Sequence, residues 1–249
     1  MFDPDEGKAA DGTIVTGVAR SRVPSAFEPV LQAAVQQANG RSLYLYGSVA
    51  TGHARQGVSD LDLLSVGASG RTAGPELSRQ FAGLVRGVEI SALTAQDLVG
   101  DSDESYGNRV FLRHYCVLLV GPDMAAGQAF PADVRAARGF NGDIAQHVEV
   151  WRGALQAGET QGLARRIARK TLLALSGLVS VHDEIWTTDR RTAAARWSKV
   201  RPELAAGLEE LSLWSEQPID CSGLEIQTMM DDVVSPIVRD FRSAVGLWN

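Results

Sequence analysis

Two aspartates separated by one residue, Asp60 and Asp62, form the pattern in this chain with the clearest chemical meaning. They lie in the run DLDLLSV, whose alternation of polar and apolar residues predicts a β-strand. Alternate residues of a strand share a face, so we expect both carboxylates to point the same way, about 6 to 7 Å apart. Two hard oxygen donors at this spacing suit Mg²⁺, which commonly keeps substrate phosphates in its coordination shell.

Two further features could act on a phosphate bound beside this pair. The run SLYLYGS predicts a strand that ends at Gly47 and Ser48, and a strand that leads into a helix start directs backbone N–H groups at an anion. Glu89, on a strand predicted for VEISAL, is a candidate third carboxylate, with Asp97 and Asp101 as alternatives. With two cations, three carboxylates can stabilise the attacking and leaving oxygens of a phosphoryl or nucleotidyl displacement.

These residues must be positioned by strands and helices. The order of the predicted strands and helices indicates an α+β domain over residues 21–128, with a small mixed sheet flanked by helices. Apolar residues at helical spacing predict helices over 23–40 and 74–87, and YCVLLVG, residues 115–121, predicts a fourth strand. The acidic stretch GDSDESYGN, residues 100–108, is interpreted as a loop.

The rest of the chain predicts a different architecture. Residues 129–249 show helical spacing almost throughout, for example at Ile144, Val148, Trp151 and Leu155, which indicates a C-terminal helical bundle domain. The acidic, glycine-containing residues 1–20 are expected to form a flexible N-terminal tail.

Composition excludes several classes of protein. The net charge of -6 disfavours extended nucleic-acid binding, which needs a basic face. No apolar run is long enough for a membrane span, and two cysteines in 249 residues are too few for a disulfide framework. We therefore expect a cytoplasmic protein, as a monomer, without a membrane partner.

Basic residues concentrate in one part of this acidic chain. Between residues 165 and 201, nine basic residues stand against three acidic ones, which predicts a local site for a polyanion. Lys170 and Arg191 are the candidate contacts for a triphosphate, although a basic helix face exposed to solvent would give the same spacing. Tryptophans that could stack on a base or an acceptor are usually core residues at this spacing; the candidates are Trp151, Trp186 and Trp197.

The stretch GSVATGHARQGVSDLDL resembles the signature of the polymerase-β-type nucleotidyltransferase superfamily. In that signature Gly-Ser is followed after about ten residues by Asp-x-Asp, and here eleven residues separate Ser48 from Asp60. The run GVEISAL is similar to the strand that carries the third carboxylate, which makes Glu89 the matching position. Within the superfamily, the chain most resembles the streptomycin and spectinomycin (aminoglycoside) adenylyltransferases. Their triphosphate lysine corresponds to Arg191 in TTDRRTAAARW, a departure that keeps the charge and changes its geometry.

The resemblance implies an N-terminal nucleotidyltransferase domain and transfer of AMP from ATP, with release of pyrophosphate. Two Mg²⁺ ions would be held by Asp60 and Asp62, and Glu89 would be a third ligand or the general base. Gly47, Ser48, Lys170 and Arg191 would bind the nucleotide. The implied acceptor is a small hydroxylated molecule, with a cationic aminoglycoside, and hence antibiotic resistance, among the candidates.

Two alternatives remain at this point. The same chemistry could modify a protein or a tRNA in a toxin or antitoxin role, or the chain could be a catalytically silent nucleotide-binding interaction protein. The acidic residues Asp101, Asp103 and Glu104 would suit a cationic acceptor, but acidic loops are also common on solvated surfaces.

Overall fold

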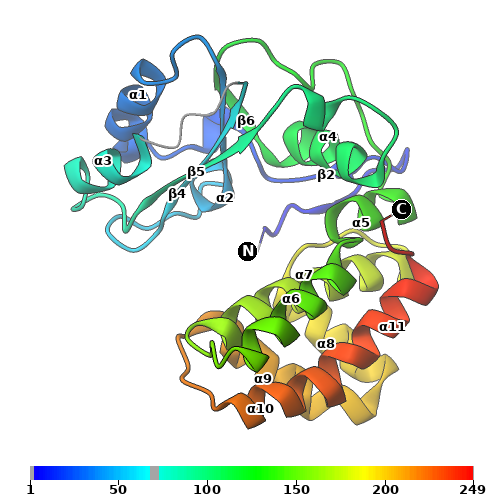
Figure 1. Ribbon diagram of the computed structural model, residues 1–249. Helices are drawn as coiled ribbons and strands as arrows, with labels where there is room; N and C mark the ends of the chain where they lie inside the picture. Colours follow the sequence, from blue (N-terminus) through cyan, green and yellow to red (C-terminus); the bar gives the residue numbers. More distant parts are fainter. Residues whose placement is uncertain (1–2, 68–72, 249) are drawn as a thin grey trace.

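The computed structural model describes residues 3–67 and 73–248, which form an α+β fold with a sheet-containing half and a helical half. Figure 1 shows the sheet and its helices in the upper part of the view and the helices of the C-terminal region below them. The predicted fold class is confirmed. The residue boundaries at 20 and 128 stay predictions.

The sheet has four strands in the order β5-β4-β3-β6. Strand β3 (Ser42–Tyr46) pairs antiparallel with β4 (Leu61–Val66) and with β6 (Val117–Val120), whereas β4 pairs parallel with β5 (Val88–Leu93). The sheet is therefore mixed, as expected.

The alternation along β4 divides its residues between two cores. Leu61 and Leu63 are fully buried in the core under α1 (Glu28–Gln36) and α3 (Ala73–Gln80). Leu64 is buried on the other side of the sheet, together with Leu112 of α4 (Asp103–Tyr115). Asp62, two residues before Leu64, shares the face that α4 covers.

Helix α4 begins inside the stretch that we interpreted as a loop, so that interpretation is wrong from Asp103 onward. The cause is a good helix start: the Ser102 hydroxyl accepts a hydrogen bond from the Ser105 amide at 3.1 Å. Asp103 and Glu104 then lie in the first turn, where the helix dipole favours acidic side chains.

The second half of the chain is helical, as predicted. Its long central helix is α7 (Leu163–His182), and 13 of its residues are buried. The other elements are α5 (Val134–Asn141), α6 (Ile144–Gln156), α8 (Arg190–Val200), α9 (Ala205–Glu216), α10 (Gly223–Met229), a π-helical turn (Met230–Val234) and α11 (Ser235–Ala244). The core of this half also takes in Tyr106 and Val110 of α4, so α4 packs against both halves.

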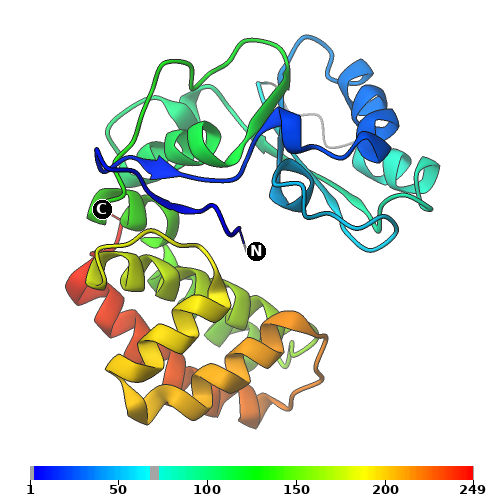
Figure 2. The same cartoon turned by 180° about the vertical axis from the view of Figure 1, so that it is seen from behind.

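Residues 3–19, named the N-terminal strap here, differ from the expected flexible tail. They contain the short strands β1 (Gly7–Lys8) and β2 (Ile14–Val15), which pair antiparallel. Ile14 is only 2% exposed and belongs to the helical core. Figure 2 shows the strap, in dark blue, running between the two halves. Burial of apolar and hydrogen-bonding groups orders this segment in spite of its polar composition.

Across residues 3–67 and 73–248, none of the helices combines the length and the hydropathy that a membrane crossing requires.

Candidate functional site

Asp62 and Glu89 lie side by side at one end of the sheet. Asp62 is paired in register with Glu89 on the parallel strand β5 and with Tyr46 on the antiparallel strand β3. Register partners on neighbouring strands project to the same face of a sheet, about 5 Å apart at the backbone. The three side chains therefore form one polar row, with Asp62 between Glu89 and Tyr46.

Asp60 lies one residue before β4 and is held by a cation. Arg86, just ahead of β5, donates from Nε to Asp60 Oδ1 at 3.0 Å and from Nη2 to Oδ2. This two-pronged contact is the usual geometry of a guanidinium on a carboxylate. The Arg86 side chain is 60% exposed, so solvent weakens the ion pair.

The electrostatics of Asp62 reflect a crowd of like charges. Its pKa is raised to about 6, first by burial and then by the negative charges of Glu89 and Asp60. Arg169 and Arg86 oppose the rise. Because Arg169 belongs to α7, a cation from the helical half acts on the charge of Asp62.

The three predicted metal ligands do not form a closed cage. In the described part of the chain, no group of three or more His, Cys, Asp or Glu side chains is close enough to hold a metal ion. Asp62 and Glu89 are neighbours, but Asp60 is turned to Arg86. The oxygen donors have the chemistry that Mg²⁺ prefers, and a cation would relieve the repulsion that raises the pKa of Asp62.

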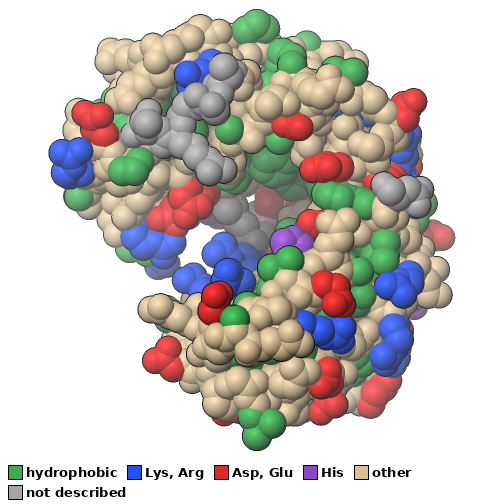
Figure 3. Space-filling model, in the orientation of Figure 1, with side chains coloured by type: hydrophobic (Ala, Val, Ile, Leu, Met, Phe, Trp, Pro, Cys, Tyr) green, Lys and Arg blue, Asp and Glu red, His purple; other side chains and the backbone are tan. Residues whose placement is uncertain are grey.

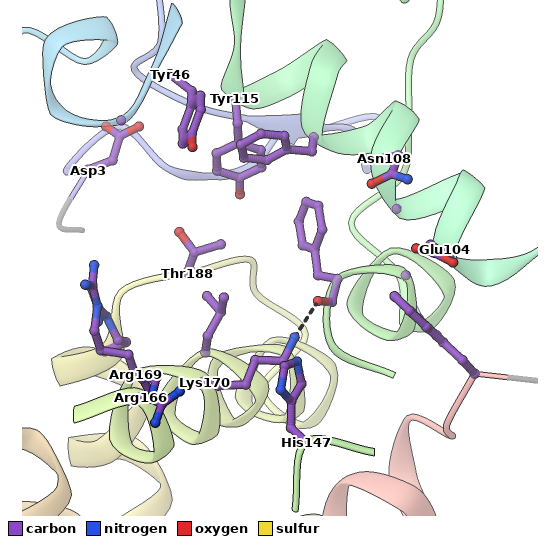
Figure 4. A pocket seen from close by; sticks show the side chains of 18 of the residues that line it. Asp3, Tyr46, Glu104, Asn108, Tyr115, His147, Arg166, Arg169, Lys170 and Thr188 are labelled. Atoms are coloured by element: carbon purple, nitrogen blue, oxygen red, sulfur yellow. Dashed lines mark hydrogen bonds between the residues drawn. The ribbon is translucent and has the colours of Figure 1, made fainter. Parts of the chain in front are cut away.

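A cavity of about 860 Å³ lies between the two halves. Tyr46 of this row lines it, whereas Asp60, Asp62 and Glu89 are outside its described lining. Figure 3 shows a hollow between the halves with Lys and Arg side chains at its margin. In the close view of Figure 4, Tyr46 and Tyr115 lie on one side of the cavity and the basic side chains of α7 on the other. The basic residues among those that line it are Arg166, Arg169, Lys170 and Arg190.

The Gly47–Ser48 pair reaches the cavity through its glycine. Gly47 begins the short helix α2 (Gly47–Ala50) directly after β3 and has a φ of +76°, which a side chain would strain. Gly47 and Thr51 line the cavity, whereas Ser48 is outside its described lining. The predicted serine contact with phosphate stays a prediction.

The two predicted triphosphate contacts lie in different places. Lys170 lines the cavity, with its Nζ 2.7 Å from Asp143 Oδ1. Arg191 is outside the described lining: its side chain is 76% exposed and pairs with Glu216. Arg190 faces the cavity instead, and burial, together with the charge of Arg169, lowers its pKa.

Sequence reasoning missed three of the basic lining residues, but part of the signal was present. Arg166, Arg169, Lys170 and Leu173 follow the spacing i, i+3, i+4, i+7, which is one face of a helix. The choice of Arg190 over Arg191 depends on the angle at which α8 starts. Asp189 sets that start, because its side chain accepts a hydrogen bond from the Thr192 amide at 2.8 Å.

Aromatic rings form a continuous wall of the cavity. Tyr46 contacts Phe111 edge to face at 5.2 Å between ring centroids, Phe111 stacks on Tyr115 at 5.9 Å, and Tyr115 meets Phe140 at 5.6 Å. These four rings line the cavity, and so does Trp151. The described lining leaves out the other two candidate tryptophans, Trp186 and Trp197, which are buried in the helical core.

The acidic stretch contributes less to the cavity than a polycationic ligand would need. Glu104 lines the cavity, but Asp103 pairs with Arg138 at 2.8 Å, and Asp101 is outside the described lining. Asp3 of the strap also lines it, although its carboxylate already accepts hydrogen bonds from the amides of Gly17 and Asp5.

Comparison with known families gives a match over part of the chain. Residues 29–103 match the family model described as nucleotidyltransferase domain. This range includes Gly47, Ser48, Asp60, Asp62 and Glu89. No curated protein matches the chain. The chain therefore carries a nucleotidyltransferase domain over residues 29–103 and is an enzyme of the transferase class.

Proposed function

We propose that this enzyme transfers AMP from ATP to a hydroxyl group of a small acceptor, with magnesium and with release of pyrophosphate. The observation that supports this proposal most is the apposition of charges between the two halves. The positive charge of Arg169 acts on Asp62, and Arg169 lies in the same cavity wall as Arg166 and Lys170. Carboxylates on one side and guanidinium or ammonium groups on the other suit a metal-bound triphosphate.

In the proposed reaction, the acceptor oxygen attacks the α-phosphorus of ATP. The bond from the α-phosphorus to the bridging oxygen breaks, pyrophosphate leaves, and the hydroxyl proton passes to a base, for which Glu89 is our candidate. Magnesium, one ion or two, would be held by Asp62 and Glu89 with Asp60, and would supply charge stabilisation to the transferring phosphate. Asp60 would exchange its contact with Arg86 for the cation.

The acceptor is the finer part of the proposal. The described lining of the cavity includes four basic side chains, the carboxylates of Asp3 and Glu104, and a continuous aromatic wall. These walls favour a hydroxylated molecule with an apolar ring face and few cationic groups, so a polycationic aminoglycoside is the less favoured candidate.

The decisive test follows label from ATP labelled at the α-phosphorus. With magnesium, we expect transfer to at least one member of a panel that includes neutral and monocationic ring compounds, aminoglycosides, tRNA and proteins. Asp62→Asn is expected to lower transfer at least 100-fold, because the charge that holds the cation is lost. Asp101→Asn, a change outside the described lining of the cavity, is the matched control.

Three results would contradict the proposal. Equal transfer by Asp62→Asn and the wild type would show that Asp62 takes no part in the reaction. Label found only on tRNA or protein would show that the acceptor is a macromolecule and not a small molecule. An absence of any transfer, with nucleotide binding indifferent to magnesium, would overturn the reaction itself.

A further inference from the structure

One carboxylate of the N-terminal strap, that of Glu6, forms hydrogen bonds with both halves. Its Oε1 accepts hydrogen bonds from the Tyr115 hydroxyl at 2.6 Å and from the Thr188 hydroxyl at 2.7 Å. Its Oε2 accepts from the Thr188 backbone amide at 2.6 Å. Tyr115 ends α4, and Thr188 lies in the loop before α8. Glu6 thus connects segments 109 and 182 residues away.

This junction is part of the cavity wall. Tyr115 and Thr188 both line the cavity, and so do Asp3 and Val18 near the two ends of the strap. Figure 4 shows Thr188 between the tyrosines on one side and the basic residues of α7 on the other. The strap lies outside the matched range 29–103, so the family match assigns it no role.

The position of Thr188 determines where Arg190 points. Arg190 is the second residue after Thr188, and Asp189 between them caps α8. A shift of the Thr188 backbone would therefore move the first turn of α8 and the guanidinium group that it presents to the cavity. Tyr115 is held as well, because the Trp186 ring nitrogen donates to its hydroxyl at 2.6 Å.

From this geometry, and resting on the proposed function, we propose that Glu6 is a positioning residue for nucleotide binding. It holds the turn Thr188–Arg190 against the end of α4, so that Arg190 faces the phosphates of ATP. Glu6 itself contacts no substrate in this proposal.

The chemistry of the junction requires a carboxylate. Two oxygens that only accept meet three donors. A glutamine of the same size has one accepting oxygen, and its NH₂ group would face either the Thr188 amide or the two hydroxyls. One or more donors would lose its partner, and the turn would shift.

The test measures binding of an unreactive ATP analogue, α,β-methylene-ATP, with magnesium by calorimetry. Glu6→Gln is expected to raise the dissociation constant about tenfold, the effect of losing one strong hydrogen bond. The matched control is Asp5→Asn, which makes the same change one residue away in the strap, at a carboxylate that pairs with exposed Arg22. The control is expected to change the constant less than twofold.

A double-mutant cycle separates positioning from a general loss of structure. If Glu6 acts through Arg190, adding Glu6→Gln to Arg190→Ala should weaken binding no further. Effects that multiply instead would overturn the proposal, as would Glu6→Gln binding as tightly as the control. If Glu6→Gln does not fold, the same cycle with Thr188→Val, which removes one of the three donors, decides in its place. Absence of nucleotide binding by the wild type would contradict the proposed function instead. Failure of the positioning role and failure of the proposed function are therefore distinguishable.

Discussion

At the scale of single residues, the clearest property of this protein is that the ionised form of Asp62 is disfavoured. Asp62 is half-buried beside Glu89, and its pKa rises to about 6 because burial and two like charges disfavour its ionised form. Keeping Asp62 ionised in the folded state therefore costs free energy at neutral pH in the absence of a counter-ion. A cation beside these carboxylates would remove this cost.

The pKa of Asp62 predicts a pH-dependent effect of Asp62→Asn on stability. The pKa in the folded state lies above the ordinary value of 3.8, so the stabilising contribution of the protonated form is full below about pH 3.8 and is lost as the pH rises through about 6. Asparagine does not titrate. In EDTA at pH 8, we expect the free energy of unfolding of the variant to exceed that of the wild type by at most about 3 kcal/mol. Screening by solvent reduces this difference.

Urea unfolding at pH 4 and pH 8 measures this difference. The gain of the variant should shrink towards zero at pH 4, where the wild-type carboxyl is largely protonated. A gain of the same size at both pH values would show that the ionisation of Asp62 is not its cause. Asp101→Asn serves as the control for removing an acidic charge elsewhere.

At the scale of elements, the starts of helices decide which side chains reach the cavity. Helix α8 begins with two adjacent arginines. Successive residues of a helix point in directions about 100° apart, so the two side chains lie on different faces. The cap by Asp189 turns Arg190 to the cavity and leaves Arg191 to pair with Glu216 at the surface. The resemblance to adenylyltransferases favoured Arg191, whereas the fold favours its neighbour.

This pair predicts different kinetics for two otherwise equal substitutions. Arg190→Ala is expected to raise the KM for ATP at least tenfold, because a charge-assisted contact with phosphate is lost from a desolvated wall. Arg191→Ala should change the KM less than twofold. Steady-state kinetics of the two variants measures the difference, and a larger effect from Arg191→Ala would favour the position that the resemblance implies over the one that lines the cavity.

The contact between α4 and α5 depends on two glycines that line the cavity. A Cβ atom added to Gly107 would lie 2.3 Å from the carbonyl oxygen of Gly139, so the two helices could not keep their separation. Gly107→Ala is expected to cost roughly 1 to 3 kcal/mol of stability by overpacking. Gly153→Ala, on the exposed face of α6 with open space around it, should instead add up to about 1 kcal/mol. Thermal unfolding of both variants checks the opposite signs.

At the scale of the whole molecule, the cavity is a joint product of both halves and of the strap. The sheet contributes Tyr46, α2 contributes Gly47, α7 contributes its basic face, and the strap contributes Asp3. A nucleotide that bridges these parts would stabilise them together, because binding to the folded state stabilises every part of the site.

Hydrogen exchange tests whether ligand and magnesium bridge the halves. With α,β-methylene-ATP and magnesium, we expect slower exchange in peptides that cover α4 and also in those that cover the first half of α7. Peptides of α9, away from the cavity, should change little. Protection confined to one half would contradict a shared site.

Much of the fold could be predicted from local pattern. The alternation of Asp60, Leu61, Asp62 and Leu63 predicts a strand and its polar face, and the helical spacing from Ile144 to Leu155 predicts α6. The stretch that begins α4 was interpreted wrongly as a loop, and the N-terminal strap was expected to lack the strands that it contains; both segments are polar. Capping by Ser102 and the burial of Ile14 order them, and neither effect is visible in composition.

The sequence by itself therefore determined the class of reaction. Gly47, Ser48, Asp60, Asp62 and Glu89 lie within one stretch of chain, where spacing and strand period are sufficient to relate them. Only the tertiary structure decided which cations meet the carboxylates, that Arg86 holds Asp60, and that Glu6 ties the strap to the cavity. These contacts join segments distant in the chain, and their geometry depends on helix starts and packing angles that no local pattern encodes.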